Sequence, residues 1–249
     1  MRKIHVVTRK EEIDPLKMEG KTAVVFDVLL ATSAITTVLH HGAVSVIPIL
    51  DAAHAKKRAN LLKKEEYILV GEYEGKTIEG FLDPNPSSLK EAAAGKKVIL
   101  STTNGTVAIH KSSPSLKVYA CSLLNARAIS DQLITENENE TIIIVCSGSS
   151  GLFSLEDFYG AGYLISLLTL ELDFELSDSA RTAKLFYEGN HQDPFHILSQ
   201  SRVGQMLKKH GFEEEIHFIC RRDCFDIIPV LKGDELINLS TASVRVVRE

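Results

Sequence analysis

The sequence lacks features that would assign it to a membrane-spanning, nucleic-acid-binding or secreted class of protein. No stretch approaches about 18 uninterrupted apolar residues, so we expect no membrane-spanning helix. Its 28 lysine and arginine residues are outnumbered by 33 acidic residues and form no dense basic stripe, which argues against nucleic-acid binding. The first ten residues carry charges at both ends of a short apolar core, which is typical of a first strand and not of a signal peptide.

Cysteine is scarce and points to no particular chemistry. Four cysteines in 249 residues, without a secretory signal, are expected to be reduced thiols in the cytoplasm. Cys220 and Cys224 have no second pair of ligands at zinc spacing. Residues 121–127 match the pattern C-x5-R of thiolate phosphatases, but so short a pattern occurs easily by chance, and the two leucines inside it are typical of buried side chains.

Several common phosphate-site motifs are also missing. The chain has no Gly-Lys-Ser/Thr of a Walker loop and no GxGxxG of a dinucleotide site. Asp27 is followed two residues later by Leu29, so the DxD pattern of aspartyl phosphatases is absent. The nine histidines are scattered without metal-ligand spacing, and no Ser-His-Asp set is evident.

The sequence does contain a regular alternation of strand and helix patterns. Beyond the N-terminal strand, strands are predicted at residues 22–26, 44–49, 67–70, 97–100, 118–121, 142–146, 215–220, 226–230 and 235–239. Helices are predicted at 31–41, 51–66, 88–94, 125–135, 154–172, 179–187 and 194–211, and after the polar loop 101–106. This alternation predicts an α/β protein of three layers, α/β/α, around a mostly parallel or mixed sheet. No low-complexity linker divides it, so we expect one domain over residues 1–249.

The stretch 141–162 shows most clearly how such a fold could build a site. A strand at 142–146 is followed by a loop of small residues, 147–151, whose backbone can approach a ligand closely. Ser154 stands three residues before Asp157, the spacing of a capping box at the start of a helix. An ordinary tight turn followed by a helix cap explains the same pattern, so the stretch alone does not define a site.

Other strand ends carry the same kind of residue. Asp27 and Glu72 follow predicted strands, and so do the loops 102–106 and 147–151. Ligands of open α/β sheets bind at the carboxyl ends of strands, where small polar loops and helix N-termini can hold an anion. Mg²⁺ favours one or two carboxylates with water and substrate oxygens. The candidates are Asp27, Glu72, Glu156 and Asp157, although each could instead be a helix cap or a surface charge.

Ordered blocks of sequence resemble one family, the Mg²⁺-dependent 2-phosphosulfolactate phosphatases. The matching blocks are Asp27-Val-Leu-x-Ala-Thr32, Gly71-Glu72 with Glu79-Gly-Phe81, Thr102-Thr-Asn-Gly-Thr106, Ser122-Leu-Leu-Asn125, Gly151-x-Phe-Ser-Leu-Glu-Asp157 with Gly160-Ala-Gly162, and Asp226-x-x-x-Pro229. No single block is specific, but the set runs through nearly the whole chain in the order of the family.

The resemblance implies hydrolysis of (2R)-2-phospho-3-sulfolactate to 3-sulfolactate and phosphate, with Mg²⁺ as cofactor. We expect Asp27 and Glu72 to hold the metal, and Glu156 or Asp157 to be a further ligand or the base that orients water. The residues expected to contact the small anionic substrate are Thr32, Asn85, Thr102, Thr103, Asn104, Gly105, Thr106, Asn125, Arg127, Ser147 and Gly148. A homodimer in the cytoplasm is the default expectation.

Two departures from the family pattern bear on the substrate. Leu30 stands where the family usually has arginine, and residues 80–87 differ from the family's Gly-Phe-Asp-Leu-Gly-Asn-Ser-Pro. A guanidinium is a strong partner for an anionic group, and Arg127 or Arg181 is a candidate replacement. The alternatives are a phosphatase for another small phosphorylated hydroxy acid, or an anion-binding protein without turnover.

Overall fold

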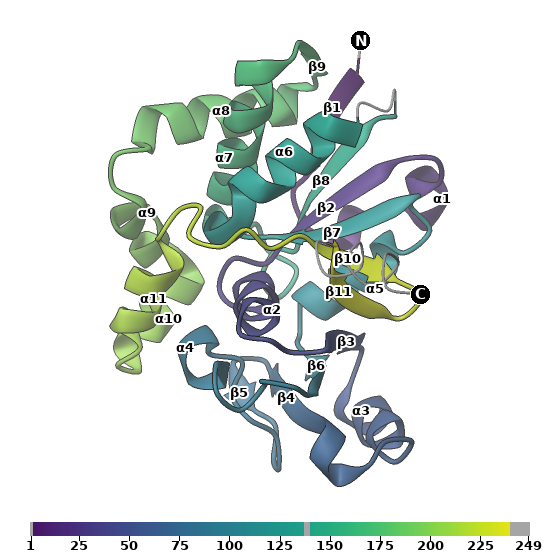
Figure 1. Cartoon of the computed structure of the whole chain (residues 1–249). Coiled ribbons are helices and arrows are strands. Elements are labelled where there is room, and N and C mark those ends of the chain that lie inside the picture. The colour runs from purple at the N-terminus through teal and green to yellow at the C-terminus, as the bar shows by residue number, and fades with distance from the viewer. Residues whose placement is uncertain (1, 137–139, 240–249) are drawn as a thin grey trace.

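A mixed sheet forms the centre of the computed structural model, which describes residues 2–136 and 140–239 (Figure 1). Within these residues eleven strands follow the order β5-β4-β6-β3-β11-β10-β7-β2-β8-β1-β9. The strands are β1 (Arg2–Val7), β2 (Thr22–Phe26), β3 (Ser45–Ile49), β4 (Tyr67–Tyr73), β5 (Lys76–Thr77), β6 (Lys97–Ser101), β7 (Lys117–Cys121), β8 (Ile142–Cys146), β9 (Phe174–Leu176), β10 (Pro229–Lys232) and β11 (Glu235–Asn238).

Helices cover both faces of this sheet (Figure 1). They are α1 (Pro15–Met18), α2 (Ala31–His40), α3 (Ala52–Ala59), α4 (Pro86–Leu89), α5 (Gly105–Ser112), α6 (Ala126–Glu136), α7 (Leu155–Glu171), α8 (Asp178–Asn190), α9 (Pro194–Gln200), α10 (Arg202–Lys209) and α11 (Glu213–Ile219). Among the residues described, no helix combines the length and the apolar character needed to cross a membrane.

The sheet consists of two parallel blocks joined by a hairpin. Strands β7, β2, β8, β1 and β9 are parallel to one another, and so are β4, β6 and β3. The hairpin β10–β11 lies between the blocks and is antiparallel to both neighbours, each through one residue pair, Val230 with Tyr119 and Leu236 with Val46. The three successive pairings β3–β11, β11–β10 and β10–β7 are all antiparallel, so strand direction reverses three times and the two blocks run in opposite senses.

Alternation along the strands produces separate cores on the two faces, as the period of two in a strand requires. On β2, Val24 and Phe26 belong to a core with residues of α6, α7 and α8, whereas Ala23 and Val25 belong to a core with α2 and α5. The second core also includes Val46 and Val98 of the other block. The expected three-layer α/β/α fold with a mixed sheet is therefore confirmed.

Most predicted elements are present, and the errors lie mainly after residue 190. Residues 215–220, predicted as a strand, belong largely to helix α11, whose acidic first turn complements the helix dipole. The helix predicted over 194–211 is two helices, because Ser201 ends α9 and caps α10 by accepting a bond of 2.9 Å from the Gly204 N–H. Of the strand predicted at 226–230, only the last two residues lie in β10.

Three helix ends before residue 190 were also predicted from local sequence signals, and one of the three is confirmed. The helix predicted over 51–66 ends at Ala59. Helix α4 begins at Pro86, with Asn85 and not Ser88 at its N-cap position, because proline fits the first turn of a helix. Ser154 does cap α7, accepting a bond of 3.2 Å from the Asp157 N–H.

The crossing of α7 and α8 yields a stability prediction. A Cβ at Gly162 would lie 2.1 Å from the Ala183 carbonyl oxygen, so Gly162→Ala must separate the helices. We expect it to lower the free energy of unfolding by about 1–3 kcal/mol in urea denaturation. Gly189→Ala, in α8 with open space around its Cβ, is the matched control and should be neutral or stabilising by up to about 1 kcal/mol. Equal urea midpoints for Gly162→Ala and the wild type would contradict this packing.

Candidate active site

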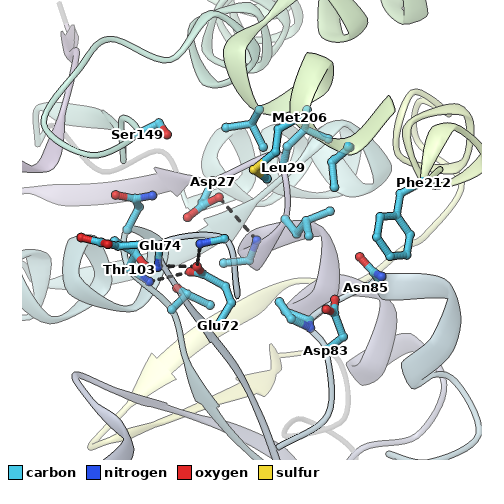
Figure 2. Close-up of a pocket in the computed structure, with 18 of the residues that line it drawn as sticks. Asp27, Leu29, Glu72, Glu74, Asp83, Asn85, Thr103, Ser149, Met206 and Phe212 are labelled. Carbon is cyan, nitrogen blue, oxygen red and sulfur yellow. Dashed lines mark hydrogen bonds between the residues drawn. The ribbon is translucent and has the colours of Figure 1, made fainter. Parts of the chain in front are cut away.

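A cavity of about 430 Å³ lies where carboxyl ends of strands from both blocks meet (Figure 2). Asp27 follows β2 and Ser149 follows β8, while Glu72 is next to last in β4 and Thr103 follows β6; all four line the cavity. Each of the four was expected at or after a strand end, and the cavity brings ends from both blocks together although the blocks run in opposite senses. The cavity thus combines side chains that are far apart in the chain.

Asp27 is buried at the centre of this junction. Its backbone N–H donates to Thr32 Oγ1 over 3.1 Å, and its Oδ1 accepts a bond of 3.4 Å from the Ala31 N–H. Burial, together with the nearby charge of Glu72, raises the pKa of Asp27 to about 7. A carboxylate in this place is costly unless a proton or a cation accompanies it.

Gly105 allows helix α5 to begin directly against this carboxyl. A Cβ at Gly105 would lie 2.7 Å from Asp27 Oδ2 and 2.6 Å from the Ala31 Cβ. Its N–H lowers the pKa of Asp27, which opposes part of the effect of burial. Glycine is therefore required here for close approach, and the N-terminus of α5 adds favourable potential for negative charge.

Glu72 is held by three hydrogen bonds on the other side of the cavity (Figure 2). Its Oε1 accepts from the Thr103 N–H over 2.7 Å, and its Oε2 accepts from the Gly75 N–H over 2.7 Å and from Thr103 Oγ1 over 3.1 Å. A carboxylate has about four lone-pair sites, so this arrangement fixes the side chain and leaves capacity on Oε1.

Asp157 lies behind the cavity and joins two of its loops. Its Oδ1 accepts a bond of 2.8 Å from the Val28 N–H after β2, and its Oδ2 accepts one of 3.2 Å from the Gly148 N–H after β8. Burial and the charges of Asp27 and Glu156 raise its pKa well above the usual range. The side chain is therefore placed to position the loops.

Glu156 is also buried and is not among the residues that line the cavity. Burial raises its pKa, while hydrogen bonds with Ser201 and Ser154 and the charge of Arg202 act in the opposite direction. It thus connects the start of α7 to the start of α10, next to the cavity wall.

The structure separates the expected substrate residues into three groups. Those that line the cavity are Asn85, Thr102, Thr103 and Asn104. Those directly behind its wall are Thr32, Gly105, Thr106, Ser147 and Gly148. Thr102 and Thr106 brace the loop reciprocally, each accepting a bond of 3.2 Å from the backbone N–H of the other.

Asn125 and Arg127 form the third group and do not line the cavity. The Nδ2 of Asn125 donates to the carbonyls of Ala120 and Ile227 over 3.3 and 3.0 Å, and its Oδ1 accepts from the Ser122 N–H over 2.9 Å. Both amide protons are therefore used within the fold. The backbone N–H of Arg127 is likewise bound to Asp223 Oδ1 over 2.8 Å.

Arg202 brings a guanidinium to the cavity, a contribution that the sequence analysis missed. Its Nη2 donates to the carbonyl and the hydroxyl of Ser149 over 3.3 and 3.1 Å. The two arginines considered from the sequence, Arg127 and Arg181, are absent from the cavity lining. Ser201, a residue type common at N-caps, was the available signal, because a helix that begins there has Arg202 at its N-terminus.

The donor set fits a small hard cation held partly by the protein. Asp27 and Glu72 both line the cavity and are close enough to influence each other electrostatically. Within residues 2–136 and 140–239 no group of three or more His, Cys, Asp or Glu side chains could hold a metal ion. Mg²⁺ commonly binds through one or two carboxylates and retains water, so a pair is sufficient for it.

The fold and the cavity define an α/β/α protein with a small-molecule cavity at the carboxyl ends of its strands. A family model described as 2-phosphosulpholactate phosphatase matches residues 7–234. The chain therefore belongs to this family, as the resemblance predicted. A probable 2-phosphosulfolactate phosphatase of Clostridium perfringens (strain SM101 / Type A) is 39% identical over 238 residues, 94% of this chain and 95% of the relative. The protein of that description from Clostridium novyi (strain NT) is 36% identical over 230 residues, 91% and 96% of the two chains.

The raised pKa of Asp27 predicts how stability depends on pH in metal-free buffer. Because the pKa is higher in the folded state than its ordinary value of 3.8, the contribution of Asp27 to stability falls as pH rises to about 7 and is constant above. Between roughly pH 5.5 and 8, the free energy of unfolding of the wild type should fall by about 2 kcal/mol more than that of Asp27→Asn.

Urea denaturation in EDTA measures this difference. His40, whose pKa is lowered by burial, changes stability in the opposite direction, but it does so in both proteins and cancels in the comparison. Parallel pH profiles for the two proteins would show that Asp27 is not held in the environment described.

Proposed function

We propose that the protein is a Mg²⁺-dependent phosphomonoesterase that hydrolyses 2-phospho-3-sulfolactate to 3-sulfolactate and phosphate. The observation that carries the proposal is the pair Asp27 and Glu72, which faces anion-binding donors in one cavity. The family supports the reaction, since its relatives carry the name of this phosphatase. The carboxylate pair supports magnesium as the metal, because Mg²⁺ commonly binds through one or two carboxylates.

Asp27 and Glu72 are the proposed ligands of the metal. Bound there, Mg²⁺ would withdraw charge from the phosphoryl oxygens and so favour attack by water. Each carboxylate is held by backbone N–H groups, so little reorganisation is needed when the site is loaded.

Other residues bind the anionic groups and hold the loops. Arg202 and the hydroxyls of Ser149 and Thr102 are the proposed partners of phosphate and carboxylate oxygens. Asp157 is a positioning residue in this proposal, because both of its oxygens accept backbone N–H groups of loops that form the site. Glu156 has a related role at the start of α10.

The continuous sheet and the core shared by its two blocks support one domain over residues 1–249. Homodimer formation and a cytoplasmic location stay predictions.

A second candidate is a phosphatase for another small phosphorylated hydroxy acid. Leu30, at the position where the resemblance leads one to expect arginine, lines the cavity and offers no charge to a sulfonate. A binding protein without turnover is the alternative of another class, and phosphate release distinguishes it from both enzymes.

The first test is phosphate release from racemic 2-phosphosulfolactate, with 2-phospholactate as the control ester. We expect release with Mg²⁺, loss of activity in EDTA, and recovery when Mg²⁺ is restored, because the carboxylate pair alone repels an anionic ester. Release that is unaffected by EDTA would remove the metal from the proposal. Absence of release from either ester, with Mg²⁺ present, would favour the binding protein.

A second test concerns the cation of the cavity. Arg202→Ala should lower kcat/KM about 10- to 100-fold, because charge-assisted hydrogen bonds to the substrate are lost. Arg202→Lys should recover part of this loss, since it keeps the charge without the planar fork. Arg181→Ala is the control, because Arg181 is exposed on α8 and outside the cavity. Equal kinetics for Arg202→Ala and Arg181→Ala would contradict the assignment.

A further inference from the structure

The segment that follows β1, residues 8–12, binds the loop after β8 from outside the cavity. The Lys10 N–H donates to the carbonyl of Ser147 over 3.1 Å, and Arg9 Nη1 donates to the carbonyl of Gly151 over 3.1 Å. These two carbonyls stand at the two ends of that loop. None of the residues 8–12 lines the cavity, so the segment lies behind its wall.

The side chain of Lys10 extends from this segment to the other small loop of the cavity, residues 102–106. It is buried, and its Nζ donates to Asn104 Oδ1 over 2.8 Å. It also pairs with Glu11 Oε1 at 2.8 Å, but Glu11 is exposed, and an ion pair at the surface stabilises a protein little. A lysine that only paired with Glu11 would gain by remaining in solvent, because burial removes hydration from its ammonium. The buried position therefore favours the contact with Asn104.

The amide of Asn104 has its orientation set by two donors. Its Oδ1 accepts the bond from Lys10 and a second one, of 3.3 Å, from the Ser150 N–H. Both partners are donors, so the atom that they share is the carbonyl oxygen, and Nδ2 lies on the other side of the amide. Nδ2 makes no hydrogen bond to the described residues, and Asn104 lines the cavity. The side chain makes no cap bond to α5 either, so its N–H groups are available to a ligand.

We infer that Lys10 is a positioning residue of the site, which holds Asn104 so that its Nδ2 donates to an anionic group of the substrate. The inference rests on the proposed phosphatase activity and adds a residue outside the cavity to it. Without the ammonium, Oδ1 keeps only the longer bond from Ser150, and the amide can turn its oxygen toward the anion. A cation bound to Oδ1 also polarises the amide and strengthens its N–H groups as donors.

The first measurement is the kinetics of Mg²⁺-dependent phosphate release from 2-phosphosulfolactate by Lys10→Met. We expect KM to rise about 3- to 10-fold and kcat to change less than about twofold, because the lost hydrogen bond holds the ester and the transition state alike. Lys10→Arg, which keeps a cationic donor, should recover part of the loss. Lys17→Met is the matched control, because Lys17 is exposed on α1, and it should have the KM of the wild type.

A second background distinguishes positioning from a contribution to the fold. In Asn104→Ala the amide is absent, so adding Lys10→Met should change KM by less than about twofold. A lysine that only stabilised the fold would lower activity by the same factor in both backgrounds. That result would overturn the inference.

Two other results separate the inference from the proposed function. If the wild type releases phosphate and Lys10→Met has the same KM as Lys17→Met, the inference is wrong and the phosphatase stands. If the wild type releases no phosphate in the presence of Mg²⁺, the proposed function fails and the inference fails with it.

Discussion

The burial of one carboxyl group, that of Asp27, is the constraint on which the cavity depends. A charge in this position needs compensation, and the backbone near Asp27 provides only part of it. Burial and the charges of Glu72 and Glu156 raise the pKa of Asp27 to about 7, while the Ala31 and Gly105 N–H groups stabilise the anion and lower it. An arrangement that only stabilised the fold would gain by replacing this acid with an uncharged side chain. In the proposed function, a cation that binds beside Asp27 supplies the remaining compensation.

The sheet places residues of two separate blocks of strands around Asp27. Parallel blocks that ran in the same sense would place their carboxyl ends along one edge of the sheet. Here the hairpin β10–β11 reverses the second block, and Glu72 and Thr103 of that block nevertheless line the same cavity as Asp27. The hairpin shares one residue pair with each block, and a common core with Val25 and Val98 supports the junction. The site thus depends on the packing of both blocks.

The local part of this arrangement could be predicted from sequence. Strand ends, small loops and the Ser154 cap are short-range signals, and they identified Asp27, Glu72 and the 102–106 loop. The family was predicted from its resemblance to the ordered blocks of sequence. The opposed blocks could not be predicted, because strand order depends on long-range pairing. Asn125 was expected to contact the substrate because it lies in a family motif. Its amide instead binds the carbonyls of Ala120 and Ile227 within the fold. Arg202 was missed because only the packing of α10 brings it to the cavity.

The C-terminal helices therefore carry the part of the site that strand-end rules do not describe. Helix α10 supplies a guanidinium and an apolar face, and α11 supports the opposite wall: buried Glu215 accepts bonds of 2.7 and 2.6 Å from the backbone N–H and Oγ of Ser87, beside Asn85. Helices α10 and α11, which follow one another in the chain, thus support two different walls of the cavity. The strand ends hold the groups proposed for the chemistry, which any phosphate ester would need. In the proposed function the residues of α10 that line the cavity face the remainder of the substrate, so changes there would alter substrate preference while the acidic pair is kept.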